Sequence, residues 1–342
     1  MILCCGEALI DMIPTPTTTG RDGYVPHAGG AVFNTSIALG RLGVQTGMLT
    51  GLSTDMFGQQ LADALKASHV DTSHVITSNR PTTLAFVRLQ DGHATYSFFD
   101  ENSAGRMLST DDLPEVSTEV SSLYFGGISL ACEPGASTYA ALLEREGKAR
   151  AVMMDPNIRP QFIQDIDRYR ARLDGMMALA DIVKVSDEDL NWMVPSPLSL
   201  TEKVNAVLDR GPSVVILTRG GEGATGFLAD GAEVNVPAQR VEIVDTVGAG
   251  DTFNAGVLAK LYELGALQKP KLKSLPPDAL RQALEHGARV AAVTVSRAGA
   301  NPPGPRKSER PRIEQINALH TFKTVRFGAL SECANSHQIP AT

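Results

Sequence analysis

The chain has little cysteine for its 342 residues, and none of it in C-x-x-C spacing. Cys4 and Cys5 fall in an apolar run that indicates a buried first strand, and the other two are Cys132 and Cys333. Buried, reduced thiols are therefore expected rather than disulfides. No apolar run approaches the roughly 20 residues of a transmembrane helix, and Glu7 interrupts the N-terminal apolar stretch, which argues against a signal peptide. We expect a cytoplasmic protein with no membrane partner.

A basic excess is also missing, because 31 Lys and Arg residues stand against 38 Asp and Glu, a formal net charge of -7. This balance argues against a dedicated binder of nucleic acid or anionic membranes. It leaves room for a phosphate ligand in a locally positive site or on backbone amides. None of the seven histidines stands at metal-ligand spacing.

Short apolar runs alternate with stretches of helical periodicity over most of the length. The runs are residues 2–5, 122–125, 151–154, 181–185 and 214–218. Helix-period stretches such as 134–147 and 165–179 separate them. This alternation predicts βαβ units and an α/β fold with a mostly parallel sheet. Active residues in such sheets gather beyond the carboxyl ends of the strands.

One region departs from that alternation. Residues 82–90 and 93–99 are β-rich and flank Asp91-Gly92, which is a strong hairpin signal. Residues 12–27 contain three prolines and are not helical in pattern. We interpret 12–27 and 82–103 as a small β-sheet lid that excludes water from a site; a surface hairpin without function is the alternative. The core would be 1–11, 28–81 and 104–325, and 326–342 a peripheral tail.

The most informative segment runs from Asp245 to Gly256. Gly248, Ala249 and Gly250 precede a helix-period stretch, so they are expected in its first turn, where unpaired amides make an anion site. Asp251 lies next to it, where a carboxylate can take the proton of a hydroxyl that attacks a phosphate. The alternative is that Asp251 only stabilises the helix N-terminus.

A second segment runs from Ala28 to Ser36. Gly29 and Gly30 lead into a helix, and Asn34 would stand on its first turn. An amide there can donate to and accept from sugar hydroxyls. A capping role explains Asn34 equally well.

Together the two segments, with Gly51 and Phe57-Gly58, resemble the two signature motifs of the ribokinase-like (PfkB) carbohydrate kinases. The resemblance extends from Gly6-Glu7 to about Pro302 in the family's order and spacing. It implies a Rossmann-like α/β domain with a β-sheet lid. It also implies transfer of phosphate from ATP to a sugar, with Mg²⁺ as cofactor.

The resemblance also assigns roles by position. Asp251 matches the catalytic base, and Gly248, Ala249 and Gly250 match the anion hole. Positions that hold the sugar are matched by Asp11, Gly29, Gly30 and Asn34. The nucleotide loop is matched by Thr218, Gly220, Gly221 and Gly223, while Gly287 should lie near the adenine. Arg159 is placed to reach phosphate, although a surface ion pair is an equal alternative.

Two departures from the family pattern concern ions. Ser186 and Asp189 replace the usual Asn and Glu that organise magnesium and phosphate, yet oxygen ligands remain. Many members also bind a monovalent cation, and a K⁺ requirement is a further hypothesis because Pro303 replaces a hydroxyl residue there. The matching positions for this cation are Asp245, Val247, Thr294, Arg297 and Gly299.

Residues 6–11, 101–106 and 155–160 most resemble bacterial fructokinases, so we predict transfer to the 6-hydroxyl of D-fructose. The closest rival is 2-keto-3-deoxygluconate kinase, which commonly carries an arginine where this chain has Asp100. That carboxylate would repel an acidic sugar, although Arg106 could bind it instead. Another PfkB sugar kinase is a further alternative, and a sugar sensor without catalysis on the same fold is a remote one. No G-x-G-x-x-G joins an early strand to a helix, so a dinucleotide enzyme is disfavoured. Exposed lid edges predict a homodimer through the lid.

Overall fold

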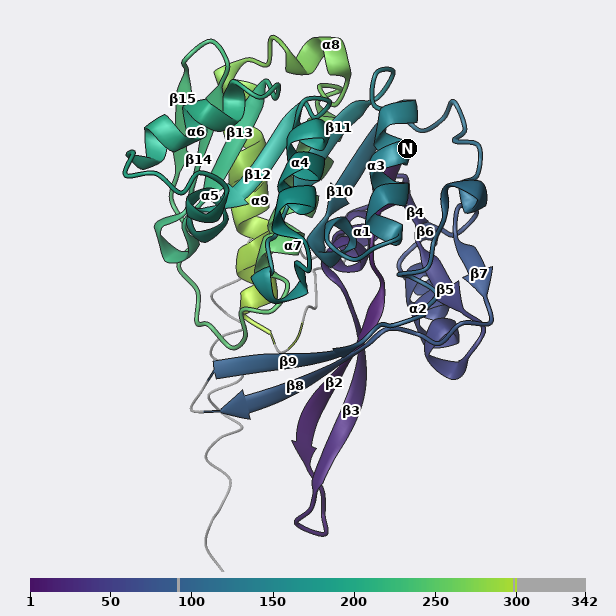
Figure 1. The fold of residues 1–342 in the computed structure, drawn as a ribbon. Coiled ribbons are helices and arrows are strands. Elements are labelled where there is room, and N and C mark those ends of the chain that lie inside the picture. The colour runs from purple at the N-terminus through teal and green to yellow at the C-terminus, as the bar shows by residue number, and fades with distance from the viewer. Residues whose placement is uncertain (91–92, 298, 300–342) are drawn as a thin grey trace, which may run out of the picture. The chain divides into compact units, whose positions relative to one another are not determined.

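The structure is a computed structural model that describes residues 1–90, 93–297 and 299 (Figure 1). All of them belong to one unit, Met1–Ser308. Four parts of the sequence predictions lie outside the described residues: the turn at Asp91-Gly92, residue Pro303, the end of the core and the tail 326–342.

A large sheet organises the described residues. Its strand order is β15-β14-β13-β12-β11-β10-β1-β4-β6. The seven strands from β13 to β6 are mutually parallel, and β14 and β15 are added antiparallel at one edge. The parallel strands are β1 (Ile2–Cys5), β4 (Thr46–Leu49), β6 (Val70–Asp71), β10 (Ser122–Gly126), β11 (Ala151–Asp155), β12 (Ile182–Ser186) and β13 (Val214–Thr218). The antiparallel ones are β14 (Ala224–Leu228) and β15 (Glu233–Val236).

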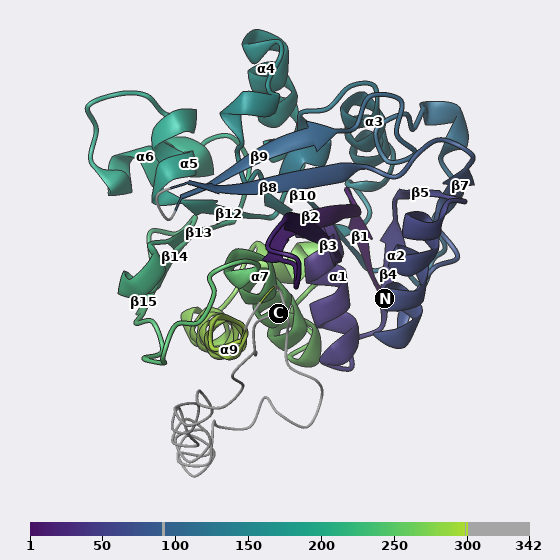
Figure 2. The same ribbon diagram turned by 90° about the horizontal axis from the view of Figure 1, so that it is seen from below.

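Helices cover both faces of this sheet, which explains why successive residues of its central strands are buried. In β1, Ile2 and Cys4 face one apolar cluster while Leu3 and Cys5 face the other. Figure 2 shows the two helix layers. The first contains α1 (Ala31–Arg41), α2 (Met56–Ala67), α7 (Ala249–Glu263), α8 (Lys269–Leu272) and α9 (Pro277–Val295). The second contains α3 (Gly135–Glu146), α4 (Ile166–Met177), α5 (Asp187–Met193) and α6 (Leu200–Leu208).

The α/β fold with a mostly parallel sheet is thus confirmed. Each of the five apolar runs forms a strand, with ends that differ from the expected ones by one residue at most. Cys4, Cys5 and Cys132 are free thiols, while Cys333 is outside the described part. No described helix combines the length and apolar content that a membrane span requires.

A separate small sheet follows β1. Its order is β3-β2-β8-β9, from the strands β2 (Leu9–Pro16), β3 (Asp22–Gly29), β8 (Leu84–Gln90) and β9 (His93–Phe99). Two antiparallel hairpins are joined by the parallel pair β2–β8. It projects from the carboxyl end of β1, beneath the large sheet in Figure 1. Its strands fall mainly in the predicted lid segments, but β2 and β3 extend into residues 9–11 and 28–29. The division into core and lid stays a prediction.

Short elements complete the connections. A two-stranded sheet pairs β5 (Gly51–Ser53) with β7 (Ile76–Ser78). The 3₁₀ turns are η1 (Thr110–Asp112), η2 (Gly127–Leu130), η3 (Pro160–Phe162) and η4 (Gly220–Glu222).

Candidate active site

Helix α7 begins as the sequence predicts, at the turn of Gly248, Ala249 and Gly250. Gly248 has φ 75°, a left-handed conformation that favours glycine, and Ala249 is the first helical residue. No side chain caps this helix within the described residues. Ala249 N already donates to Thr246 O at 3.2 Å. The amides of Gly250 and Asp251 therefore remain as donors for an anion, with the helix dipole behind them.

Asp251 lies in that first turn and is 9% exposed. Its Oδ2 accepts a hydrogen bond of 2.9 Å from Asn34 Nδ2 on α1. Thr35 Oγ1 donates to the main-chain oxygen of Asp251 at 3.1 Å. Two helices that are about 200 residues apart in sequence are thus joined at the carboxylate.

Burial raises the pKa of Asp251 from its usual value to about 7. The bond from Asn34 and the positive charge of Lys184 oppose that rise, whereas the negative charges of Asp155 and Glu7 add to it. A carboxylate with a pKa near neutrality is suited to general base catalysis at physiological pH. An acid that only stabilises a helix N-terminus does so in its ionised form. The role of Asp251 as the base stays a prediction.

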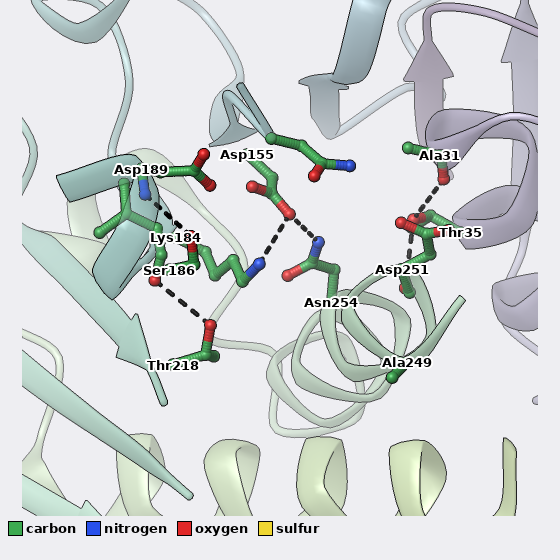
Figure 3. Close-up of polar contacts among 12 residues, drawn as sticks. Ala31, Thr35, Asp155, Lys184, Ser186, Asp189, Thr218, Ala249, Asp251 and Asn254 are labelled. Atoms are coloured by element: carbon green, nitrogen blue, oxygen red, sulfur yellow. Dashed lines mark hydrogen bonds and ion pairs between the residues drawn. The ribbon is translucent and has the colours of Figure 1, made fainter. Parts of the chain in front are cut away.

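The structure brings a buried lysine to this turn that the sequence analysis missed. Lys184 projects from β12, is 5% exposed, and donates from Nζ to Asp155 Oδ2 at 3.1 Å (Figure 3). A Cβ added at Gly250 would lie 3.5 Å from that Nζ. A cation next to an uncapped helix N-terminus strengthens the anion site. The signal for it was a lone charge in the apolar run Ile-Val-Lys-Val.

Asn254, one helical turn after Asp251, was missed as well. Its Nδ2 donates to Asp155 Oδ2 at 2.7 Å and to the Tyr124 hydroxyl at 3.0 Å. Asp155 Oδ1 and Asn254 Oδ1 are buried and have no hydrogen-bond partner among the described residues. Buried acceptors without donors are rare, so these two oxygens point to water or a cation there.

The two glycines that precede α1 allow close approach of the backbone. A Cβ at Gly29 would lie 2.1 Å from Asp11 Oδ2, and Gly30 has φ 106° with Glu7 O 2.9 Å from its added Cβ. Burial raises the pKa of Asp11 to about 6. Glu7 Oε1 accepts from Ala31 N at 2.9 Å and so holds the start of α1. The Asp11 carboxylate therefore packs against Gly29, while Asn34 is hydrogen-bonded to Asp251.

The two arginines predicted to bind substrate have different surroundings. Arg106 Nη1 pairs with Asp100 Oδ1 at 2.9 Å, and its Nε donates to Glu133 O at 2.8 Å. Arg159 is exposed and donates to the Ile158 carbonyl at 3.0 Å. Since Arg159 makes no ion pair with any described residue, the surface ion pair that the sequence left open is not found.

Ser186 and Asp189 both serve local structure. Ser186 Oγ caps α5 by accepting from Asp189 N at 3.0 Å. Asp189 Oδ1 accepts from Ile158 N at 2.9 Å and holds the loop after β11. Burial raises the pKa of Asp189. Their part in organising magnesium stays a prediction.

The predicted nucleotide loop follows β13. Thr218 Oγ1 donates to Val185 O at 3.3 Å, and Gly220 and Gly223 have φ 49° and 99°. A Cβ at Gly223 would lie 2.2 Å from Val236 O, whereas Gly221 has open space. These glycines shape a tight turn, and contact with a nucleotide remains a prediction.

Gly287 lies where α9 crosses α7. A Cβ there would lie 2.9 Å from Val257 Cγ2 and 3.0 Å from the Phe253 ring. Helix packing therefore explains this glycine, while its place beside adenine stays a prediction.

The segments predicted to hold a monovalent cation lie together. Asp245 Oδ1 accepts from Val247 N at 3.0 Å, and its Oδ2 accepts from Gly299 N at 2.8 Å. Thr294, which precedes Val295, is fully buried, and Asp245 N donates to Val295 O at 3.2 Å. Arg297 donates its main-chain N–H to Thr294 O at 3.0 Å. No group of three His, Cys, Asp or Glu side chains suited to a metal occurs in the described part of the chain.

Comparisons with known proteins identify the family of the chain. The model of the pfkB family of carbohydrate kinases matches residues 1–307. The chain belongs to that family. It is 51% identical over 285 residues to a fructokinase of Rhizobium leguminosarum bv. trifolii, covering 82% of this chain and 86% of the relative.

Two solved structures extend the family likeness to the fold. A fructokinase from Xylella fastidiosa with bound ATP superposes with a TM-score of 0.82 at 26% identity, covering 93% of this chain and 98% of that one. An aminoimidazole riboside kinase from Salmonella enterica, in complex with aminoimidazole riboside and an ATP analog, superposes with a TM-score of 0.75 at 25% identity, covering 94% and 99%. The ribokinase-like fold of this PfkB chain is thus confirmed.

Proposed function

We propose that this chain is an ATP-dependent fructokinase that transfers the γ-phosphate to the 6-hydroxyl of D-fructose. The observation that carries the proposal is the 51% identity to a fructokinase over 82% of the chain. The fold alone does not choose the sugar, since an aminoimidazole riboside kinase shares it. A cytoplasmic location belongs to the same proposal.

The proposed mechanism follows from α7. Asp251 takes the proton of the 6-hydroxyl while the hydroxyl oxygen forms a bond to the γ-phosphorus of ATP. The bond from that phosphorus to the oxygen that bridges it to the β-phosphate breaks, and ADP is released. The anion hole predicted at Gly248, Ala249 and Gly250 stabilises the charge on the transferred group. Ala249 N would have to share its bond of 3.2 Å to Thr246 O to take part. Lys184, held by Asp155 at 3.1 Å, adds a buried positive charge beside them.

Magnesium would neutralise charge on the phosphates of ATP during this transfer. The buried oxygens of Asp155 and Asn254 that have no donor fit a hydrated magnesium ion, because this ion prefers oxygen ligands and keeps waters. Asp11, Gly29, Gly30, Asn34 and Arg159 are proposed to contact the sugar or its phosphate.

The Asp100–Arg106 pair argues against 2-keto-3-deoxygluconate as the substrate. The arginine that could have received a substrate carboxylate already neutralises Asp100 at 2.9 Å. The carboxylate of an acidic sugar would have to displace Asp100 from Arg106 or lie close to Asp100, which carries the same sign of charge. A neutral sugar such as fructose meets no such cost.

A discontinuous ADP-release assay over fructose, 2-keto-3-deoxygluconate, ribose and fructose 6-phosphate tests the substrate. We expect the highest kcat/KM for fructose, with Asp251→Asn abolishing turnover while sugar binding is retained. A preference for another sugar would replace the substrate, and near wild-type turnover in Asp251→Asn would remove the base. Activity that is flat in added potassium, without sodium, would end the potassium hypothesis.

The small sheet offers a surface for a second copy of this chain. Tyr24, Phe86 and Phe99 share one face by their pairing register and contact edge to face, with ring centroids 5.1 and 5.4 Å apart. Tyr24 and Phe99 are 46% and 59% exposed. Exposed aromatic side chains beside open strand edges favour self-association. We expect a homodimer by sedimentation that Phe99→Ser weakens, and a wild-type monomer at micromolar concentration would refute it.

A further inference from the structure

Asp55 stands where α2 meets the root of the small sheet. Its Oδ1 accepts from Phe57 N at 3.0 Å and from Gly58 N at 2.8 Å. These two bonds make Asp55 an ordinary N-cap of α2. They use one of its two carboxylate oxygens.

The same carboxylate also holds Thr82. Oδ2 accepts from Thr82 N at 2.9 Å, and Oδ1 accepts from Thr82 Oγ1 at 2.6 Å. Thr82 is 7% exposed and precedes β8 by two residues. Burial favours protonation of Asp55, yet the bonds from Thr82 and Gly58 outweigh it and lower its pKa. The cap is therefore ionised, and its bonds to Thr82 are charge-assisted.

Thr82 is connected through its neighbour to the strand that carries Asp11. Thr83 O accepts from Ile10 N at 3.0 Å, and Asp11 pairs with Ala85 in the parallel register of β2 and β8. Thr83 Oγ1 donates to Ser103 Oγ at 2.8 Å, where the chain returns from β9. A shift of Thr82 would thus move both hairpins of the small sheet relative to α7.

We propose that Asp55 is a positioning residue for the sugar site: through Thr82 it fixes the root of β8, and with it the distance of Asp11 from Asp251. This inference rests on the proposed function, because it takes Asp11 to hold the sugar. The carboxylate is needed rather than an amide. In Asp55→Asn the retained oxygen can still cap α2, but its NH₂ group would face the N–H of Thr82, donor against donor.

The central experiment measures KM and kcat for Asp55→Asn. This variant loses the charge-assisted hydrogen bond between Thr82 N and the partly exposed Asp55 carboxylate. We therefore expect KM for fructose to rise about tenfold. The expected changes in kcat and in KM for ATP are within about twofold, because α7 is untouched. Thr82→Val removes the hydroxyl donor but keeps the N–H, and should raise KM for fructose about threefold.

Asp165→Asn is the matched control. Asp165 caps α4 by accepting from Arg168 N at 3.0 Å and lies in the other helix layer. The same chemical change there should leave KM for fructose at its wild-type value. Amide hydrogen exchange gives a second readout: Asp55→Asn should accelerate exchange at Thr82 while Phe57 and Gly58 keep their protection.

The outcomes separate this inference from the proposed function. Wild-type protein without turnover of fructose would overturn the proposed function and this inference with it. Active wild type with an unchanged KM in both Asp55→Asn and Thr82→Val would overturn the inference alone. So would an equal rise of KM in Asp165→Asn, since a general loss of stability would then explain it.

Discussion

Replacing Asn34 with alanine should move the pH dependence of catalysis. In the wild type the pKa of Asp251 is about 7, so kcat/KM should be half-maximal there and fall about tenfold per pH unit well below it. Asn34→Ala removes the 2.9 Å hydrogen bond that favours the ionised carboxylate. The protonated form then persists to higher pH.

The size of the shift follows from the burial of both partners, which are 8% and 9% exposed, so solvent screening is small. A hydrogen bond to a charged group contributes about 1.5–3 kcal/mol, and each pKa unit corresponds to about 1.4 kcal/mol. The midpoint should rise by about 1–2 units. At about pH 7 this lowers kcat/KM roughly 5- to 50-fold, and most of the loss should be recovered above about pH 9.

The assay is ADP release with fructose from about pH 5.5 to 9.5, with kcat/KM fitted at each pH because it reports the free enzyme. Thr35→Val is the control, since Thr35 donates to the main-chain oxygen of Asp251 rather than to its carboxylate. Loss of a sugar contact by Asn34 would lower kcat/KM at every pH without moving the midpoint. An unmoved midpoint in Asn34→Ala, or a wild-type rate that is flat down to about pH 5.5, would refute the reasoning.

Three further predictions concern stability and the small sheet. The raised pKa lets Asp251 of the folded chain keep a proton that the unfolded chain releases between about pH 4 and 7, so this group lowers the stability as pH rises through that window. Asp251→Asn should therefore raise Tm by a few degrees at about pH 8 but not at about pH 4. An equal change in Tm at both pH values would contradict this prediction. Gly256→Ala should lower the free energy of unfolding by about 1–3 kcal/mol, because its Cβ would lie 2.7 Å from Gly287 Cα. Gly175 on α4 has open space around an added Cβ, so Gly175→Ala should raise the free energy of unfolding by up to about 1 kcal/mol. Chemical denaturation measures both changes. Phe98→Ala removes the edge-to-face contact of 4.3 Å between the rings of Phe98 on β9 and Phe162 in η3, and should raise KM for fructose about two- to tenfold. Phe99 contacts Phe86 on the other face of the small sheet, so Phe99→Ala should leave KM for fructose unchanged.

The parts of the fold with a local signal could be predicted from the sequence. Apolar runs of four or five residues predicted five of the seven parallel strands because both faces of the sheet are buried, whereas β4 and β6 were not predicted. The start of α7 was predictable because Gly248 must adopt a left-handed conformation before an apolar helical pattern. The hairpin of β8 and β9 was predictable from strand propensity around Asp-Gly.

The parts of the site that arise from distant pairing could not be predicted. Lys184 and Asp155 are 29 residues apart, and Asn254 and Asp155 are 99 apart, so neither spacing carries a periodic signal. Arg106 and Asp100 are only six residues apart, yet no periodic pattern brings their side chains together, so this pair was not predicted either. The pKa of Asp251 depends on burial by α1, which a carboxylate in a sequence does not reveal.

The position of α7 unites these observations. Its middle approaches α9 closely because Gly256 and Gly287 present no side chains to each other. That packing fixes the depth of its first turn, where burial raises the pKa of Asp251. The same burial strengthens the bonds from Asn34 and Lys184, since charges interact more strongly away from water. A displacement of α7 would therefore change the anion site and the basicity of Asp251 together, so substitutions at the helix crossing should alter the pH profile as well as stability.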